Sequence, residues 1–199
     1  KKNFNYGSLT SIYWIWKNKL NDYSPDDWIG FCQYRRLWLN DLLNNKQKYS
    51  SSNLFSKLLK NDNKNFDTNE SVILQPTFFK NDSLRGQFVK KYGSKVLDDC
   101  LNLLEVDDKN DFKSYLEGNS LSICNMFITK PLIFNKYCTS MFDWIFKIYD
   151  YCDENNLLQG NNIRLPIFLV ERFTSFWFQK YTKVSYLSFA RLGDFHLSN

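Results

Sequence analysis

The sequence predicts an α/β layer domain, with helices packed on a sheet. Three short apolar runs, at 28–34, 71–74 and 121–129, have the length and composition of buried strands. Two longer segments, at 8–20 and 131–153, repeat their apolar residues every three or four positions, which is typical of helices on a core. Because the two patterns alternate along the chain, we expect the helices to cover the faces of one sheet.

Composition favours one globular domain. Aromatic residues make up 18% of the 199 residues, which is more apolar surface than a disordered chain carries. Apolar runs such as 167–170 are far shorter than the ~20 residues needed to cross a bilayer, so no membrane-spanning helix is predicted. We see no linker, and the length predicts a single domain over residues 1–199.

The first half of the chain contains one clear helix and one clear strand. The helix at 8–20 has an apolar face formed by Leu9, Ile12, Tyr13, Trp16 and Leu20. The strand at 28–34 ends abruptly at Arg35 and Arg36. The stretch at 40–69 is rich in Asn, Lys and Ser, so we predict a variable insertion with one weak helix near 54–59.

The second half alternates strands and helices more regularly. Strands are predicted at 71–74, 121–129 and 184–189, and helices at 83–92, 94–104, 112–116, 131–153 and 166–181. Asp82 or Ser83 can cap the first of these helices. Pro131 stands where the first turn of a helix tolerates proline.

The net charge indicates the class of ligand, and the cysteine usage indicates the cellular compartment. The 26 Lys and Arg exceed the 21 Asp and Glu by five, which suits an anionic ligand or an anionic membrane surface, although a solvated lysine surface is the better explanation. Five cysteines without a Cys-x-x-Cys motif argue against a disulfide scaffold or zinc site and fit a reducing cytoplasm. The single histidine, His196, lies in a polar C-terminal segment and no catalytic role is expected for it.

Metal-binding and phosphate-binding motifs are missing from the sequence. There is no Gly-rich phosphate loop, no His-Glu-x-x-His and no Asp-x-Asp. Adjacent acidic pairs occur at 26–27, 98–99 and 107–108, and we interpret all three as solvated surface. No metal cofactor is therefore predicted.

Gln33, Tyr34, Arg35 and Arg36 are the most informative polar cluster. They follow a predicted buried strand, and ligands of open α/β sheets bind outside the carboxyl ends of strands. Two guanidinium groups there can bind a diphosphate through paired, permanently charged donors. Pairing with surface carboxylates is an equally good interpretation from spacing alone.

Asn125, Glu171 and Arg172 are polar residues within apolar segments. A buried Asn125 must find hydrogen-bond partners, either in a neighbouring loop or in a ligand. Glu171 lies in the helix predicted at 166–181, where a carboxylate needs a partner to stay charged. An ion pair between Glu171 and Arg172 is one interpretation, and a general base at Glu171 is the other.

Four segments together resemble one known family. Residues 6–18, YGSLTSIYWIWKN, are similar to its segment ELTALYWIWKN, and residues 28–36, WIGFCQYRR, to its segment YIGLVHYRR. NMFI at 125–128 and Glu171-Arg172 match two shorter segments in the same order. The family is domain of unknown function 4422, a bacterial group regarded as glycosyltransferases of polysaccharide assembly with a GT-A-like fold.

The resemblance implies a GT-A-like, Rossmann-like mixed sheet that lacks the first N-terminal strand or strands. It implies transfer of a sugar from a nucleotide-sugar, by default a UDP-sugar, to a cell-surface polysaccharide or lipid-linked glycan. The implied catalytic base is Glu171; the implied donor-site residues are Gln33, Tyr34, Arg35, Arg36, Lys17 and Asn18, and those of the acceptor pocket are Asn125, Arg172 and Trp16. Arginine charge would replace a divalent metal.

Gln33 stands where the family usually has His, and this departure keeps a second hypothesis open. The alternative is a non-catalytic, glycan-binding or scaffold relative in a polysaccharide assembly complex. Both hypotheses place the protein in the cytoplasm, either free or peripheral at the inner membrane face. Nucleic acid is not an expected partner, because no RNA-recognition motif occurs and the lysines are spread along the chain.

Overall fold

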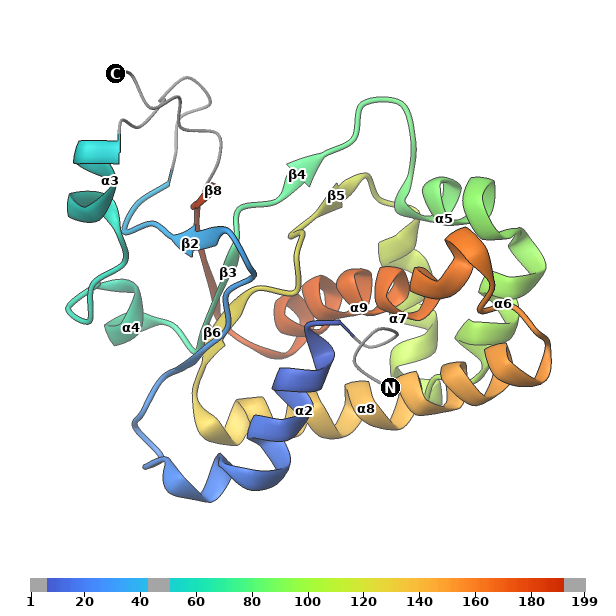
Figure 1. Ribbon diagram of the computed structural model, residues 1–199, viewed down its shortest axis with the longest axis horizontal. Helices are drawn as coiled ribbons and strands as arrows, with labels where there is room; N and C mark the ends of the chain where they lie inside the picture. The colour runs from blue at the N-terminus through green and yellow to red at the C-terminus, as the bar shows by residue number, and fades with distance from the viewer. Residues whose placement is uncertain (1–6, 43–50, 192–199) are drawn as a thin grey trace.

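The computed structural model describes residues 7–42 and 51–191, which form a mixed α/β structure (Figure 1). Its main sheet has the strand order β1-β6-β3-β7. The strands are β1 (Ile29–Gly30), β6 (Phe127–Thr129), β3 (Ser71–Leu74) and β7 (Val184–Leu187). β6 is antiparallel to both β1 and β3, and β3 is parallel to β7, so β1, β3 and β7 all run the same way. The three predicted strand segments therefore share one sheet, as expected.

Two short two-stranded ribbons stand apart from the main sheet, and their pairings were not predicted. One pairs β2 (Arg36–Trp38) with β8 (Phe189–Arg191), and the other pairs β4 (Thr77–Phe78) with β5 (Ser120–Leu121). The prediction of one strand at 121–129 was wrong, because a turn at 122–126 divides it into β5 and β6. The strand predicted at 28–34 is assigned only at β1, although the amide of Phe31 still donates to the carbonyl of Phe127 at 2.9 Å.

Helices account for most of the remaining chain. They are α2 (Leu9–Asn18), α3 (Ser51–Lys57), α4 (Asn65–Thr68), α5 (Leu84–Tyr92), α6 (Ser94–Asn102), α7 (Val106–Leu116), α8 (Pro131–Glu154) and α9 (Leu165–Tyr181), with short 3-10 turns η1 (Leu20–Asp22) and η2 (Gly160–Arg164). Ser83 caps α5 by accepting a hydrogen bond from the amide of Gly86 at 2.9 Å. None of the described helices is long and apolar enough to cross a bilayer.

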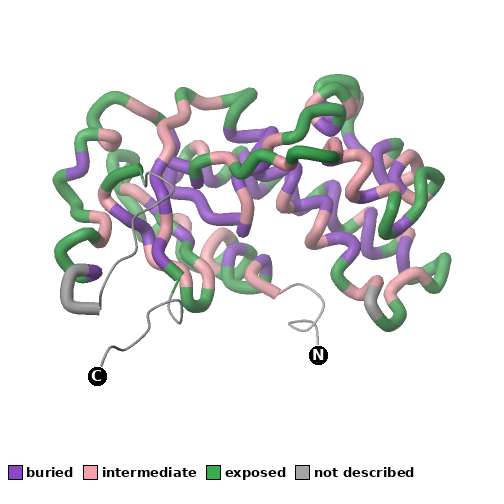
Figure 2. Tube along the Cα trace, turned by 90° about the horizontal axis from the view of Figure 1, so that it is seen from above, coloured by how far each residue is buried: buried purple, intermediate pink, exposed green. Residues whose placement is uncertain are grey.

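Alternate residues of the sheet face two separate hydrophobic clusters. Ile73 and Phe127 contribute to the larger cluster, which α8, α9 and the neighbouring helices form on one side (Figure 1). Val72 and Ile128, one position along, contribute to a smaller cluster with Trp38 on the other side. This alternation is the two-residue period of a strand. Both faces are therefore covered, and Figure 2 shows the buried residues running through the middle of the molecule.

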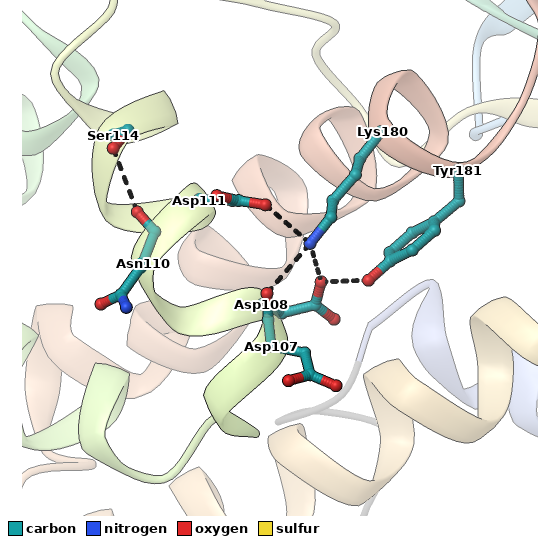
Figure 3. A network of polar contacts seen from close by, with 7 residues as sticks. All are labelled: Asp107, Asp108, Asn110, Asp111, Ser114, Lys180 and Tyr181. Atoms are coloured by element: carbon teal, nitrogen blue, oxygen red, sulfur yellow. Dashed lines mark hydrogen bonds and ion pairs between the residues drawn. The ribbon is translucent and has the colours of Figure 1, made fainter.

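A network of polar contacts joins the ends of α7 and α9 (Figure 3). The ammonium of Lys180 lies 2.9 Å from Asp108 Oδ1 and 2.9 Å from Asp111 Oδ2, and the hydroxyl of Tyr181 donates to Asp108 Oδ1 at 2.6 Å. Burial alone would lower the pKa of Lys180, but the hydrogen bonds to Asp111 and Asp108 outweigh it and raise that pKa. Asp108 is only 7% exposed, so our interpretation of 107–108 as solvated surface was wrong for Asp108.

We expect Tyr181→Phe to lower the free energy of unfolding by about 1 kcal/mol, because the buried Asp108 loses one hydrogen-bond donor. Urea denaturation measures the change. Tyr13→Phe is the matched control, since Tyr13 is similarly exposed and its hydroxyl has no hydrogen-bond partner among the described residues. Equal stability of the two variants would contradict a stabilising role for the Tyr181 contact.

Candidate functional site

Several polar segments meet at one edge of the main sheet. Because β1, β3 and β7 run parallel, the residues that follow them lie at the same edge, among them Gln33, Gln75 and Ser188. β6 runs the opposite way, so Cys124 and Asn125, which precede it, belong to this edge as well. We call it the carboxyl edge, and it is where open α/β sheets bind ligands.

The predicted cluster Gln33 to Arg36 forms a tight turn at the carboxyl edge. The amide of Arg36 donates to the carbonyl of Gln33 at 2.9 Å, and Arg35 between them has a left-handed φ of 63°. Tyr34 and Arg35 both point to solvent, with the guanidinium carbon of Arg35 4.8 Å from the centre of the Tyr34 ring. β2 begins at Arg36, directly after this turn.

A chain of hydrogen bonds connects Arg36 with Glu171. Arg36 Nη1 donates to Gln33 Oε1 at 2.5 Å, and the Gln33 amide nitrogen donates to the carbonyl of Cys124. The backbone amide of Cys124 donates in turn to Glu171 Oε1 at 2.5 Å. The structure therefore brings Gln33, Arg36 and Glu171 together around the backbone of Cys124.

Charge and burial both act on the Cys124 thiol. Burial raises its pKa to about 11, the Glu171 carboxylate adds to this increase, and the Arg36 guanidinium opposes it. A thiol with this pKa is protonated at neutral pH, so Cys124 is not suited to act as a nucleophile.

Backbone strain is concentrated at the carboxyl edge. Of the four non-glycine residues with positive φ in the described chain, three lie here: Arg35, Cys124 (φ 80°) and Asn125 (φ 48°). Residues without glycine's freedom adopt this conformation at a cost, and such residues cluster at functional sites. The strain therefore supports the assignment of a site at this edge.

Asn125 forms hydrogen bonds within the protein. Its side-chain oxygen accepts from the hydroxyl of Thr174 at 3.0 Å, and Thr174 shares a second hydrogen bond with the hydroxyl of Tyr137 at 2.7 Å. All three side chains are buried. The structure thus shows Asn125 anchoring the turn before β6 to α9.

Arg172 lies in the core and faces α5. Its Nη1 donates to the carbonyl of Phe168 at 2.9 Å and its Nη2 to Gln87 Oε1 at 2.8 Å, while its guanidinium carbon lies 3.5 Å from the centre of the Phe168 ring. Burial lowers its pKa to about 10. The described chain has no ion pair between Glu171 and Arg172, so that interpretation was wrong, and Arg172 does not reach the carboxyl edge.

Trp16, Lys17 and Asn18 lie together, away from the carboxyl edge. The indole N–H of Trp16 donates to Asn135 Oδ1 at 2.7 Å, and the ammonium of Lys17 lies 3.5 Å from the centre of the Trp16 ring. The three residues line a hollow of about 220 Å³ with Leu20, Asn21 and Asn135. None of these residues contacts the cluster around Cys124, so the structure does not unite them with Arg36.

A hollow of about 490 Å³ lies at the ends of β3 and β7. It is lined by Gln75, Pro76, Thr77, Phe78, Leu187, Ser188 and Phe189. The guanidinium carbon of Arg36 lies 5.7 Å from the centre of the Phe189 ring, which places Arg36 beside this hollow. Phe78 is 71% exposed and offers a ring face to a ligand.

Arg191 is a site residue that the sequence reasoning missed. The pairing of β2 with β8 places Arg191 directly opposite Arg36. No sequence signal indicated this contact, because the strand predicted at 184–189 ends before Arg191 and the register depends on a partner 155 residues away. No group of three or more His, Cys, Asp or Glu is arranged to hold a metal within 7–42 and 51–191, and His196 lies outside the described residues.

Comparison with known proteins identifies the family. Residues 1–183 match the family described as Domain of unknown function (DUF4422). The chain belongs to this family. A solved structure, the apo form of the bifunctional glycosyltransferase WbbM, matches with a TM-score of 0.72 and 18% sequence identity over 96% of this DUF4422 chain. The DUF4422 chain spans only 37% of the WbbM chain, and no curated protein matches it.

The match to WbbM confirms the predicted fold. At 18% identity the likeness shows the architecture alone, a mixed sheet flanked by helices that the chain shares with part of WbbM, in agreement with the predicted α/β fold. The roles of the individual residues in this DUF4422 chain follow from its own geometry.

We expect Thr174→Val to destabilise the protein by about 1–3 kcal/mol, because Asn125 and Tyr137 both lose a buried hydrogen-bond partner without a change of side-chain shape. Thr174→Ser is the control, since it keeps the hydroxyl and loses one methyl group, worth ~0.8 kcal/mol. Guanidinium unfolding compares the two. A Val variant that is as stable as the Ser variant would show that Thr174 does not anchor the turn.

Proposed function

We propose that this chain is a glycosyltransferase domain that moves a sugar from a nucleotide-sugar to a polysaccharide or lipid-linked glycan. The observation that carries the proposal is the meeting of Arg36, Gln33 and Glu171 around Cys124 at the carboxyl edge. The WbbM-like fold and the membership in DUF4422 support it.

Arg35 and Arg36 are suited to the diphosphate of the donor. Gln33 holds Arg36 in place on one side, and among the described residues Arg36 Nη2 has no hydrogen-bond partner, so the guanidinium group is pre-organised to bind an anion. Arg35 is exposed beside it. As the bond between sugar and diphosphate breaks, negative charge grows on the diphosphate, and fixed guanidinium groups stabilise that charge. In this proposal the arginines act in place of a divalent metal.

Glu171 is the proposed general base. Its Oε1 accepts from Cys124, whereas its Oε2 has no hydrogen-bond partner among the residues that the structure describes. A half-buried carboxylate with one oxygen fixed and one available is positioned to accept the proton of an acceptor hydroxyl. A UDP-sugar is the proposed donor, and the proposed location is the cytoplasm or the inner membrane face.

A specific observation favours the second candidate, a non-catalytic glycan-binding relative. Glu171 already has a structural partner in Cys124, so it would be retained without any role in catalysis. Gln33 also stands in place of the family's usual His. A protein that binds oligosaccharides but neither binds UDP nor releases it from UDP-sugars would support this candidate.

Variants of Arg36 and Glu171 should separate binding from turnover. We expect Arg36→Ala to weaken UDP binding about 10- to 100-fold, because a charge-assisted contact is worth ~1.5–3 kcal/mol. Glu171→Gln keeps an acceptor oxygen for Cys124 and should leave UDP affinity intact, yet lower turnover of a UDP-sugar by ~10²-fold. Calorimetry and UDP release measure the two effects. If the folded fraction of Glu171→Gln is fully active, Glu171 is structural and not the base.

Donor binding should not need a divalent cation. UDP affinity measured with Mn²⁺ and then with excess EDTA should differ by less than about tenfold, which corresponds to ~1.4 kcal/mol. The guanidinium groups supply the positive charge in both conditions. A larger loss in EDTA would reveal a metal site and contradict the role given to the arginines.

A further inference from the structure

Three arginines gather at the carboxyl edge without carboxylate partners. Arg35 and Arg36 lie in and after the turn, and Arg191 lies opposite Arg36 on β8. Within the described chain, no Asp or Glu oxygen lies within 4.0 Å of any of the three guanidinium groups. Arg85 shows the contrasting arrangement, since it lies 3.5 Å from Asp98 and 3.7 Å from Glu117.

The pairing of Arg36 with Arg191 is unfavourable without a ligand. Residues directly opposite in an antiparallel pair project from the same face with their Cβ atoms ~5 Å apart, and like charges there repel. The desolvation of Arg36 adds to the cost, because its Nε is buried and has no hydrogen-bond partner. An anion bound between the two side chains would remove the repulsion.

We infer that Arg191 is a third diphosphate-binding residue, which completes a clamp with Arg35 and Arg36. The inference rests on the proposed function, because it takes the anion to be the diphosphate of the donor. A diphosphate presents several oxygens on two neighbouring phosphorus atoms, and guanidinium forks bind such groups through paired hydrogen bonds. A single carboxylate has too few oxygens to accept paired hydrogen bonds from three guanidinium groups.

The surroundings of the clamp favour a nucleoside diphosphate. Phe189 is two residues before Arg191 on β8, contacts the guanidinium of Arg36, and lines the hollow of about 490 Å³. That hollow also contains the exposed ring of Phe78. A diphosphate held by the clamp would therefore have its nucleoside or sugar within reach of the hollow. Inorganic pyrophosphate has the same charged chemistry without those groups, so it tests the clamp separately.

The test compares Arg191→Ala with wild type by calorimetry, using UDP, UMP and pyrophosphate as titrants. We expect Arg191→Ala to weaken the binding of UDP and of pyrophosphate about tenfold or more. The binding of UMP should weaken less, because the clamp contacts the second phosphate, which UMP lacks. The salt dependence of UDP affinity should also fall, since one cation is lost. The melting temperature without ligand should stay the same or rise, because a like-charge pair is removed. Arg164→Ala is the control, an exposed arginine on η2 away from the edge.

The outcomes separate this inference from the proposed function. If Arg36→Ala loses UDP affinity while Arg191→Ala matches wild type, the inference is overturned and the donor site stands without Arg191. If wild type binds pyrophosphate but not UDP, and Arg191→Ala weakens pyrophosphate, the clamp stands and the nucleotide donor fails. Failure of wild type to bind either UDP or pyrophosphate overturns the clamp.

Discussion

The turn at Cys124 and Asn125 is the constraint on which the rest of the candidate site depends. Both residues have left-handed backbones, which cost non-glycine residues ~1–3 kcal/mol each unless the surroundings hold them. Here three hydrogen bonds hold them. Glu171 accepts one from the backbone amide of Cys124, Gln33 donates one to the carbonyl of Cys124, and Thr174 donates one to Asn125. A single strained turn therefore sets the positions of α9, β6 and the arginine turn relative to one another.

Much of the fold was predictable because its signals are local. β3 is a continuous apolar run, and α8 and α9 repeat apolar residues at helical spacing, so each is visible without its neighbours. The turn between β5 and β6 was not predictable, since Cys124 and Asn125 take a conformation that usually requires glycine. The ribbon of β2 and β8 was missed because each strand has three residues and gains stability only from its distant partner.

The sequence indicated which residues form the candidate site better than it indicated how they contact one another. The position of Arg36 after an apolar run indicated an anion site. The carboxylate of Glu171 within an apolar helix indicated either a charged partner or a catalytic role. The actual connection runs through backbone atoms of Cys124, which no side-chain pattern can reveal. Arg172 illustrates the converse: its neighbour in sequence is Glu171, yet successive helix residues point about 100° apart, so it packs against Gln87 instead.

Gln33 connects Arg36 to the turn at Cys124. Its amide uses both ends at once, accepting from Arg36 and donating to the carbonyl of Cys124. A neutral imidazole also has one acceptor and one donor nitrogen, so a histidine at this position would be able to make the same two bonds. The amide forms the bridge from Arg36 to Cys124, but it cannot take up a proton near neutral pH as an imidazole can. In this chain, the bridge that positions Arg36 therefore takes no part in proton transfer, and the proposed function assigns that step to Glu171 instead.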